Sequence, residues 1–166
     1  VYVVHGGPGA AVGTVDLSAL DGTNGFSVTN GDGDRRIGYS VGGAGDVNGD
    51  GVDDLLIGGG HLAAPGQEDG TSVVFGVRGA RAATLDIADL DGSNGFRLLG
   101  LAPPNGTGTN ARAAGDVNGD GVGDLVVVDA SLGVAYVLLG RAAGFAATVD
   151  VRALAPSEGF VIAGGI

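Results

Sequence analysis

Four residue types are absent from this chain of 166 residues: cysteine, methionine, tryptophan and lysine. Without cysteine there is neither a disulfide framework nor a thiolate metal site. Without methionine the chain does not begin at a translation start, so we expect it to be a processed or excised piece. No apolar run approaches the length of a membrane span and no signal peptide is visible, so we expect no membrane insertion.

Positive charge is also scarce. All eight basic residues are arginines, scattered among 19 acidic residues, and the formal net charge is −11. A nucleic-acid surface needs clustered arginine or lysine, so we exclude nucleic acid as a partner. Much of the negative charge lies in two short acidic loops, and two bound divalent cations would change the net charge from −11 to −7 (−11 + 4). The remaining charge favours solubility and selects no partner.

Aromatic residues are few, whereas there are 36 glycines and many valines, leucines and alanines. This composition predicts short strands and tight turns. No stretch shows the sustained apolar spacing of a long helix, and helix-like residues occur only around Leu17–Leu20 and Ile87–Leu90, as single turns. The length is enough for one domain that buries roughly 70% of its unfolded surface. We therefore expect an all-β fold.

Three segments of the sequence repeat in one register. They begin at Val3–Gly6, Val73–Gly76 and Leu138–Gly140, and the intervals between their glycines are 70 residues (76 − 6) and 64 residues (140 − 76). An aspartate follows each glycine by ten residues, and a phenylalanine follows ten residues later. So many matches in one register establish an internal repeat. The aspartates are Asp16, Asp86 and Asp150, and the phenylalanines, which we expect to pack between neighbouring sheets, are Phe26, Phe96 and Phe160.

Apolar runs of four to six residues between glycine and aspartate predict four short strands in each full unit. The first strand leads into the acidic loop, and the other three follow it. Residues 1–5 and 25–29 match the third and fourth strands of an earlier unit. We therefore divide the chain into a half-unit at 1–36 and two full units at 37–106 and 107–166. The predicted strands lie near 37–45, 54–57, 72–75 and 95–99, and near 108–115, 124–128, 134–139 and 159–163.

The acidic loops of the two full units are nearly identical in sequence. Counted from the first aspartate, oxygen-bearing side chains fall at positions 1, 3, 5 and 9, and glycine holds position 6. This alternation suits calcium, which takes six to eight oxygens at roughly 2.3–2.6 Å in a flexible cage. The alternative is a glycine-rich turn in which Asp and Asn cap backbone groups. The predicted ligands are Asp46, Asn48, Asp50, the Val52 carbonyl and Asp54 in the first loop, and Asp116, Asn118, Asp120, the Val122 carbonyl and Asp124 in the second.

The Asp-Val-Asn-Gly-Asp-Gly-Val-x-Asp loop, followed by an apolar strand, resembles the FG-GAP repeat, which forms the blades of the integrin α-subunit β-propeller and of many bacterial extracellular proteins. Bacterial members often also contain the Asp-Gly-Thr-Asn-Gly-Phe turn found here at 21–26, and at 91–96 with serine for threonine. The resemblance covers essentially the whole chain. It implies four-stranded propeller blades with calcium between the first and second strands. The chain departs from the pattern at Ile37-Gly38 and Gly58–Gly60, and neither departure touches a ligand position.

Three other patterns are weaker. An EF-hand or dockerin loop needs a ligand at position 12 and flanking helices. This chain has Ile57 and Val127 at position 12 and no flanking helices are expected, so we exclude this alternative. Gly38–Gly42 fits the G-x-S-x-G nucleophile motif, but that motif needs a strand–turn–helix setting and later Asp and His partners. Here a glycine-rich strand and an acidic loop follow, so we attribute the match to the abundance of glycine. His5 aligns with apolar strand residues, so we expect a structural side chain.

We therefore predict β-propeller blades of four antiparallel strands, a half-blade plus two full blades, forming a segment of a larger or multi-chain propeller. The predicted function is a non-enzymatic, calcium-binding module for binding or adhesion, secreted or at the cell surface. Two hypotheses stay open beside it: a non-catalytic part of a secreted hydrolase or lyase, and a self-associating structural subunit. The expected partners are the rest of a parent propeller or other copies of the chain, and a protein or carbohydrate ligand. The irregular loop at 59–70, which carries His61, is the expected recognition surface.

Overall fold

Short strands dominate the computed structural model, which describes all residues except 7–12, 32–36, 60–69, 100–110, 130–131 and 165–166. The fold is all-β, as predicted, and no helix of the described part is long and apolar enough to cross a membrane. The strands are β1 (Tyr2–Val4), β2 (Gly25–Thr29), β3 (Ser40–Gly45), β4 (Asp54–Gly58), β5 (Thr71–Val74), β6 (Thr84–Asp86), β7 (Gly95–Leu99), β8 (Ala111–Gly115), β9 (Asp124–Asp129), β10 (Val134–Leu138), β11 (Thr148–Asp150) and β12 (Gly159–Ala163).

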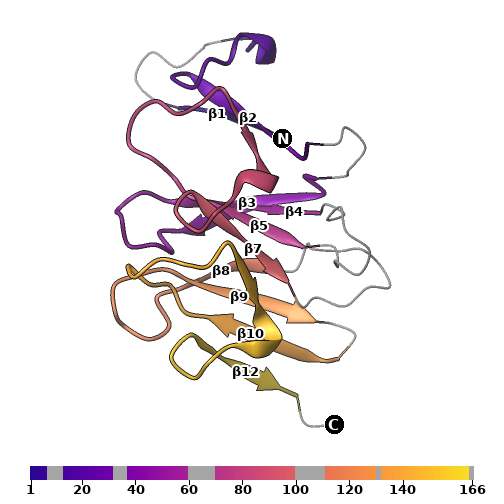
Figure 1. Ribbon diagram of the computed structural model, residues 1–166, viewed down its shortest axis with the longest axis vertical. Coiled ribbons are helices and arrows are strands. Elements are labelled where there is room, and N and C mark those ends of the chain that lie inside the picture. Colours follow the sequence, from indigo (N-terminus) through magenta and orange to yellow (C-terminus); the bar gives the residue numbers. More distant parts are fainter. Residues whose placement is uncertain (7–12, 32–36, 60–69, 100–110, 130–131, 165–166) are drawn as a thin grey trace.

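Three sheets follow one another along the long axis of the molecule, with the N-terminal strands at one end and β12 at the other (Figure 1). Strands β3, β4, β5 and β7 form an antiparallel meander in the middle sheet. Strands β8, β9, β10 and β12 form an equivalent meander in the C-terminal sheet. The third sheet contains β1 and β2, which are also antiparallel. Formed from the described strands, none of the three sheets closes on itself.

All ten predicted strands are confirmed, and within the described residues their ends move by at most three residues. The largest change is at the first strand of the first full unit, because β3 begins at Ser40, and the predicted start of β8 at 108–110 lies outside the described residues. The two predicted helical turns are also present, as 3-10 helices η1 (Leu17–Ala19) and η2 (Ile87–Asp89). A third such turn, η3 (Val151–Ala153), was not predicted.

Two short strands link neighbouring sheets and were also not predicted. Strand β6 belongs to the chain of the middle unit but pairs in parallel with β2 of the N-terminal sheet. Strand β11 pairs in parallel with β7 of the middle sheet in the same way. Each ends at an aspartate, Asp86 or Asp150, that caps the following 3-10 turn. The repeated aspartates therefore mark the point where one unit reaches back to the previous one.

The core fills the spaces between the sheets. One cluster of buried side chains lies between the N-terminal and middle sheets, and a larger one lies between the middle and C-terminal sheets. Within the larger cluster Phe96 stacks on Phe145, with ring centroids 4.2 Å apart and planes at 15°. The Arg141 guanidinium lies over the Phe145 ring, with Cζ 4.6 Å from the ring centroid. In the smaller cluster Arg81 covers Phe26 at 4.3 Å.

The prediction for the three repeated phenylalanines is right for two and wrong for the third. Phe26 and Phe96 are 3% and 0% exposed, because the next unit along the chain covers each of them. Phe160 is 44% exposed. It lies in β12, at the edge of the last sheet, where no further unit of the described chain covers it.

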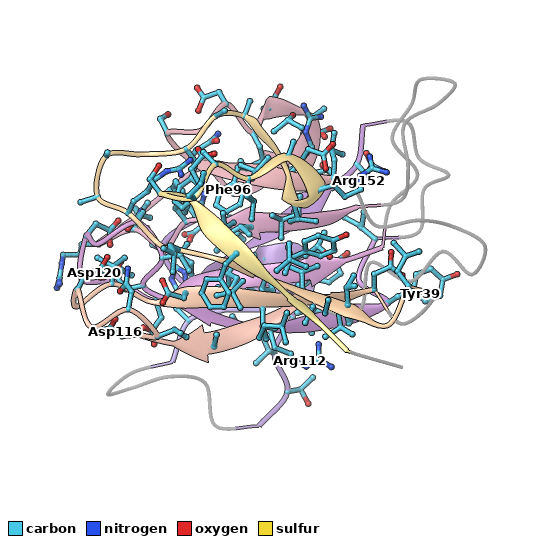
Figure 2. All side chains as sticks on the ribbon, turned by 90° about the horizontal axis from the view of Figure 1, so that it is seen from below. Tyr39, Phe96, Arg112, Asp116, Asp120 and Arg152 are labelled. Carbon is cyan, nitrogen blue, oxygen red and sulfur yellow. The ribbon has the colours of Figure 1, made fainter. Side chains whose placement is uncertain are left out.

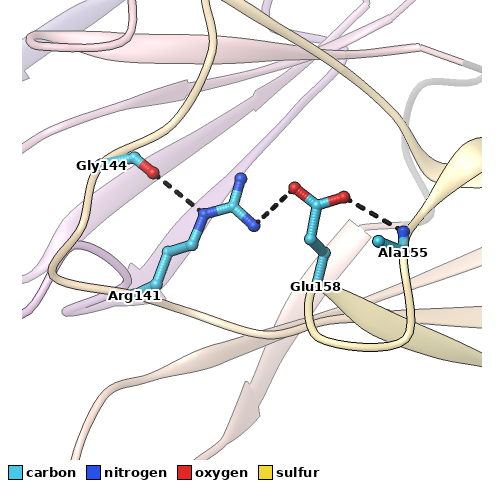
Figure 3. Close-up of polar contacts among 4 residues, drawn as sticks. All are labelled: Arg141, Gly144, Ala155 and Glu158. Atoms are coloured by element: carbon cyan, nitrogen blue, oxygen red, sulfur yellow. Dashed lines mark hydrogen bonds and ion pairs between the residues drawn. The ribbon is translucent and has the colours of Figure 1, made fainter.

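The turn that precedes β12 shares one contact with its two counterparts and differs in another. Glu158 Oε2 accepts the Ala155 N–H at 3.1 Å, as Asn24 and Asn94 accept the N–H groups of Asp21 and Asp91 in the first two turns. In those two turns the aspartate also accepts the Thr23 or Ser93 N–H at 2.8 Å, and the third turn has Ala155 in its place. Glu158 Oε1 instead accepts Arg141 Nη1 at 2.9 Å (Figure 3).

Candidate metal centres

Both acidic loops begin at a β-bulge. The pairing of β3 with β4 shifts between Gly43 and Gly45, and the pairing of β8 with β9 shifts at the equivalent place, before Gly115. Gly45 and Gly115 have φ angles of +74° and +77°, which side chains other than glycine rarely adopt. A bulge bends its strand and ends regular pairing. It thus turns the chain into the loop immediately before Asp46 and Asp116.

The first aspartate of each loop accepts hydrogen bonds from the far side of the same loop. Asp46 Oδ1 accepts the Asp50 N–H at 3.0 Å, and Asp46 Oδ2 accepts the Gly51 N–H at 2.7 Å. In the second loop Asp116 makes the same two contacts and also accepts the Gly119 N–H at 2.7 Å. Each carboxylate therefore closes its loop into a compact ring of backbone amides.

The side chains at positions 3 and 5 bond to each other and to the backbone. Asn48 Nδ2 donates to Asp50 Oδ2 at 3.0 Å, and Asn48 Oδ1 accepts the Asp50 N–H at 3.0 Å. Asp50 Oδ1 accepts the Val52 N–H at 2.8 Å. The second loop repeats all three contacts within 0.2 Å, through Asn118, Asp120 and Val122.

The aspartate at position 9 is buried and ties the loop to another strand. Asp54 Oδ2 accepts the Val47 N–H at 2.9 Å, and Asp54 Oδ1 accepts the Gly76 N–H at 2.8 Å. Asp124 makes the equivalent bonds to the Val117 and Gly140 N–H groups, at 2.7 and 2.8 Å. Gly76 and Gly140 follow the ends of β5 and β10, so each buried carboxylate joins the start of its loop to the third strand of its sheet.

Burial raises the pKa of Asp54 from its ordinary value of 3.8 to about 6. Hydrogen bonds from the Gly76 and Val47 N–H groups oppose this rise, and the charges of Asp50 and Asp46 add to it. The charges of Asp50 and Asp46 therefore disfavour the ionised form of Asp54. A bound cation would reverse this effect, because it favours the charged form of each carboxylate.

All ten predicted ligand residues lie in these two loops, and the loops fit a hard cation by the chemistry of their oxygens. Each loop gathers three carboxylates and one amide oxygen, and a carboxylate oxygen that accepts one N–H keeps a second lone pair. Within the described parts of the chain, however, no three acidic or histidine side chains already form a metal-binding group. Val52 and Val122 are fixed by their N–H bonds to the aspartate at position 5.

The two loops differ in their surroundings. The first loop lies against the C-terminal sheet: the Asp46 carbonyl accepts the Gly123 N–H at 2.8 Å, and the Val47 carbonyl accepts the Arg141 N–H at 2.9 Å. Val47 is consequently only 1% exposed, whereas its counterpart Val117 is 49% exposed. The contacts of the first loop with the following unit were not predicted from the sequence. In Figure 2, Asp116 and Asp120 of the second loop lie on the left side of the molecule, and Tyr39 lies on the right side.

The weaker candidates have ordinary structural surroundings or lie outside the described residues. His5 Nδ1 lies 2.9 Å from the Thr23 carbonyl oxygen, and its ring meets Phe26 edge-on at 6.0 Å. Ser40, of the G-x-S-x-G match, begins strand β3, which leads into the acidic loop and not into a helix. The proposed recognition loop at 59–70, with His61, falls almost entirely outside the described residues. Comparisons with protein-family models, with curated proteins and with solved structures found no match to this chain.

Proposed function

We propose that this chain is a calcium-stabilised segment of a β-propeller of the FG-GAP type that acts as a binding or adhesion module outside the cell. One observation carries the proposal: the same acidic loop, with the same side-chain contacts, occurs at the same position of two adjacent sheets. A capping turn needs hydrogen-bond acceptors, but it does not need three carboxylates around one loop. That excess of negative charge favours a cation site.

The arrangement of the sheets supports a propeller. Two four-stranded antiparallel meanders follow one another, and a short strand of each unit pairs with the sheet before it. Packing of neighbouring sheets through Phe96 and Phe145 buries side chains between units, as it must where no unit has a core of its own. We propose that the sheets are blades, with a half-blade at the N-terminal end and two full blades after it.

Calcium would act on stability in this proposal. In the first loop Asp46, Asn48, Asp50, the Val52 carbonyl and Asp54 would hold the ion, and the equivalent residues would hold it in the second. A bound dication offsets the repulsion among carboxylates and keeps the buried aspartate ionised. The first loop also bonds to Gly123 and Arg141 of the next sheet, so ordering this loop stabilises the contact between sheets.

In this proposal the two acidic loops stabilise the fold, and the protein or carbohydrate ligand binds to another surface of the chain. The second candidate function is a self-associating structural subunit, and the outer edge of β12, which pairs with no other described strand, favours it specifically. The chain could also serve as the non-catalytic part of a secreted hydrolase or lyase, which predicts the same calcium dependence.

Thermal unfolding with calcium and with a chelator tests the proposal. We expect calcium to raise the unfolding temperature by several degrees, because a few kcal/mol of binding free energy acts only on the folded state. Magnesium at the same concentration serves as the control for ionic strength and charge, and it should stabilise less, since it prefers a rigid octahedral site. Identical unfolding curves in calcium and chelator would contradict the proposal.

A further inference from the structure

In the described part of the chain, no strand covers the outer edge of β12 as strands cover its two counterparts. Strands β2 and β7 each pair in parallel with a three-residue strand of the next unit, and β12 is the edge of its sheet. The exposure of its side chains reflects this difference. Ile162 is 54% exposed, whereas Val28 and Leu98, at the same position of β2 and β7, are 1% and 0% exposed.

A segment with the sequence of the missing strand lies near the other end of the chain. Thr14-Val15-Asp16 aligns with Thr84–Asp86 of β6 and with Thr148–Asp150 of β11, yet residues 14–16 belong to no strand. Asp16 already has the extended backbone of its counterparts, with φ −82° and ψ 106°, and it caps the following turn through Ser18. The end of this segment therefore has the backbone conformation found at the ends of β6 and β11, and it joins no described sheet.

The residue that follows this segment is also uncovered. Leu17 is 41% exposed, whereas Ile87 and Val151, which follow β6 and β11, are 2% and 0% exposed. Two apolar surfaces whose counterparts are buried in the other units are thus exposed. One is the segment at 14–17, which has the sequence of a linking strand (the donor strand), and the other is the edge of β12, to which such a strand would pair (the acceptor edge).

We propose that the chain associates head to tail, with Thr14–Asp16 of one copy added in parallel to the free edge of β12 in a second copy. The register follows from β2 with β6 and β7 with β11: Thr14 would lie opposite Val161, Val15 opposite Ile162, and Asp16 opposite Ala163. The proposal rests on strand pairing and is independent of calcium binding.

The backbone donors of β12 point the right way for this pairing. Ser27 and Arg97, at the position of Val161, donate their N–H groups out of the sheet to the carbonyls of Ala83 and Ala147, at 2.8 and 3.0 Å. By the same register the Val161 N–H points away from β10, toward the free edge. In a second copy its acceptor would be the carbonyl of Gly13, which precedes the donor strand as Ala83 and Ala147 do.

The two surfaces lie at opposite ends of the molecule, so one copy cannot satisfy itself (Figure 1). An interface between different surfaces of identical chains is heterologous, and it generates rings or open chains of copies. A single added strand with a few apolar side chains buries less area than a standard stable interface, so we expect weak association.

Pro156 limits the contact to the strand itself. It stands at the position of Gly22 and Gly92, where a Cβ atom would collide with the carbonyl oxygen of Arg81 or of Phe145. The residues before the donor strand therefore cannot lie as close to the turn before β12 as they do in the other two units. This steric difference also predicts that copies bind each other less tightly than the sheets bind within one copy.

Sedimentation equilibrium of the whole chain tests the proposal. We expect the average mass to rise between about 10 µM and about 1 mM protein, with calcium or with chelator alike. The salt concentration should be about 0.15 M, to screen repulsion between copies of net charge −11. A monomer at every concentration would overturn the proposal and would leave the calcium proposal untouched.

Two proline variants then locate the contact. Val15→Pro removes the N–H of the donor strand, and Val161→Pro removes the N–H at the free edge of β12. Neither N–H is used within one copy under this register, so both variants should fold, which circular dichroism checks. Each should remain monomeric alone, whereas the matched controls Val15→Thr and Val161→Thr, which keep the N–H, should associate like the wild type.

Mixing the two proline variants gives the sharpest result. The Val161→Pro chain retains its donor strand and the Val15→Pro chain retains its acceptor edge, so an equimolar mixture should form a 1:1 dimer and no larger species. A mixture that stays monomeric would overturn the head-to-tail pairing. Proline variants that associate as strongly as the wild type would overturn it too, because copies would then meet through another surface.

Discussion

The buried aspartate at position 9 gives the most quantitative prediction of the loop geometry. Asp124 is 0% exposed and accepts two N–H groups, from Val117 and from Gly140. Replacement by alanine leaves both donors without a partner. An unsatisfied buried N–H costs about 1–3 kcal/mol, and the Val117 N–H, which is only partly buried, regains some of this from water. We therefore expect Asp124→Ala to lower the free energy of unfolding by about 2–4 kcal/mol.

A matched exposed variant separates this effect from the general loss of a carboxylate. Asp120 lies in the same loop and also accepts a backbone N–H, from Val122 at 2.9 Å, but it is exposed and water can replace it. Asp120→Ala should therefore cost about 0.5–1 kcal/mol. Both are measured by urea unfolding in chelator, so that no cation contributes, with the slope checked for a single transition. Equal losses in the two variants would refute the role assigned to the buried pair of hydrogen bonds.

Three further predictions concern calcium, pH and packing. Asp46→Ala should remove most of the calcium-dependent stabilisation that arises from the first loop. In the double variant Asp46→Ala/Asp116→Ala, the unfolding curves in calcium and in chelator should nearly coincide. In chelator, the raised pKa of Asp54 means that its contribution to the free energy of unfolding is complete below pH 4 and is lost as the pH rises through about 6. The loss should reach up to about 3 kcal/mol, and calcium should abolish it. A urea midpoint that does not change across this pH range would contradict the prediction. Phe145→Ala should cost about 2–4 kcal/mol because it removes the ring stacked on Phe96, whereas Phe160→Ala, at an exposed position, should cost less than about 1 kcal/mol in the same urea assay.

The strands were predictable because glycine and aspartate bound each apolar run, and because the repeat places equivalent runs in register. β7 and β12 have the predicted ends, and β4 and β9 begin at Asp54 and Asp124, the last residues of the acidic loops. Strands β6 and β11 were not predicted, since three residues are too few to show an alternating pattern. Their pairing is parallel and joins different units, so it depends on how sheets pack.

The exposure of Phe160 could not be read from its sequence for a similar reason. It stands at the same position of its strand as Phe26 and Phe96, after a glycine, and the difference comes from what lies beside the sheet. The repeat did contain a signal for the linking strands. Thr14-Val15-Asp16, Thr84–Asp86 and Thr148–Asp150 share one pattern, and only the last two have a sheet to join.

The residues of the candidate site could be named one by one from the sequence, because they are close in sequence, and their role as metal ligands stays a prediction. The contacts of Asp54 with Gly76 and of Asp124 with Gly140 were not predicted, since these partners lie 22 and 16 residues away along the chain. Nor could the sequence show that the first loop bonds to the following unit, through Gly123 of the second loop and through Arg141, whereas no unit follows the second loop in the described chain. Local spacing indicates candidate ligands, whereas the role of a loop in the fold depends on distant partners.

The number of calcium ions bound per chain tests the central claim most directly. Calorimetric titration at pH 7.5, up to about 10 mM calcium to include weak extracellular-type sites, should give two ions for the wild type. It should give one ion each for Asp46→Ala and Asp116→Ala, and none for the double variant. Absence of binding in the wild type, or binding that is unchanged in the double variant, would contradict the assignment of the two acidic loops as calcium sites.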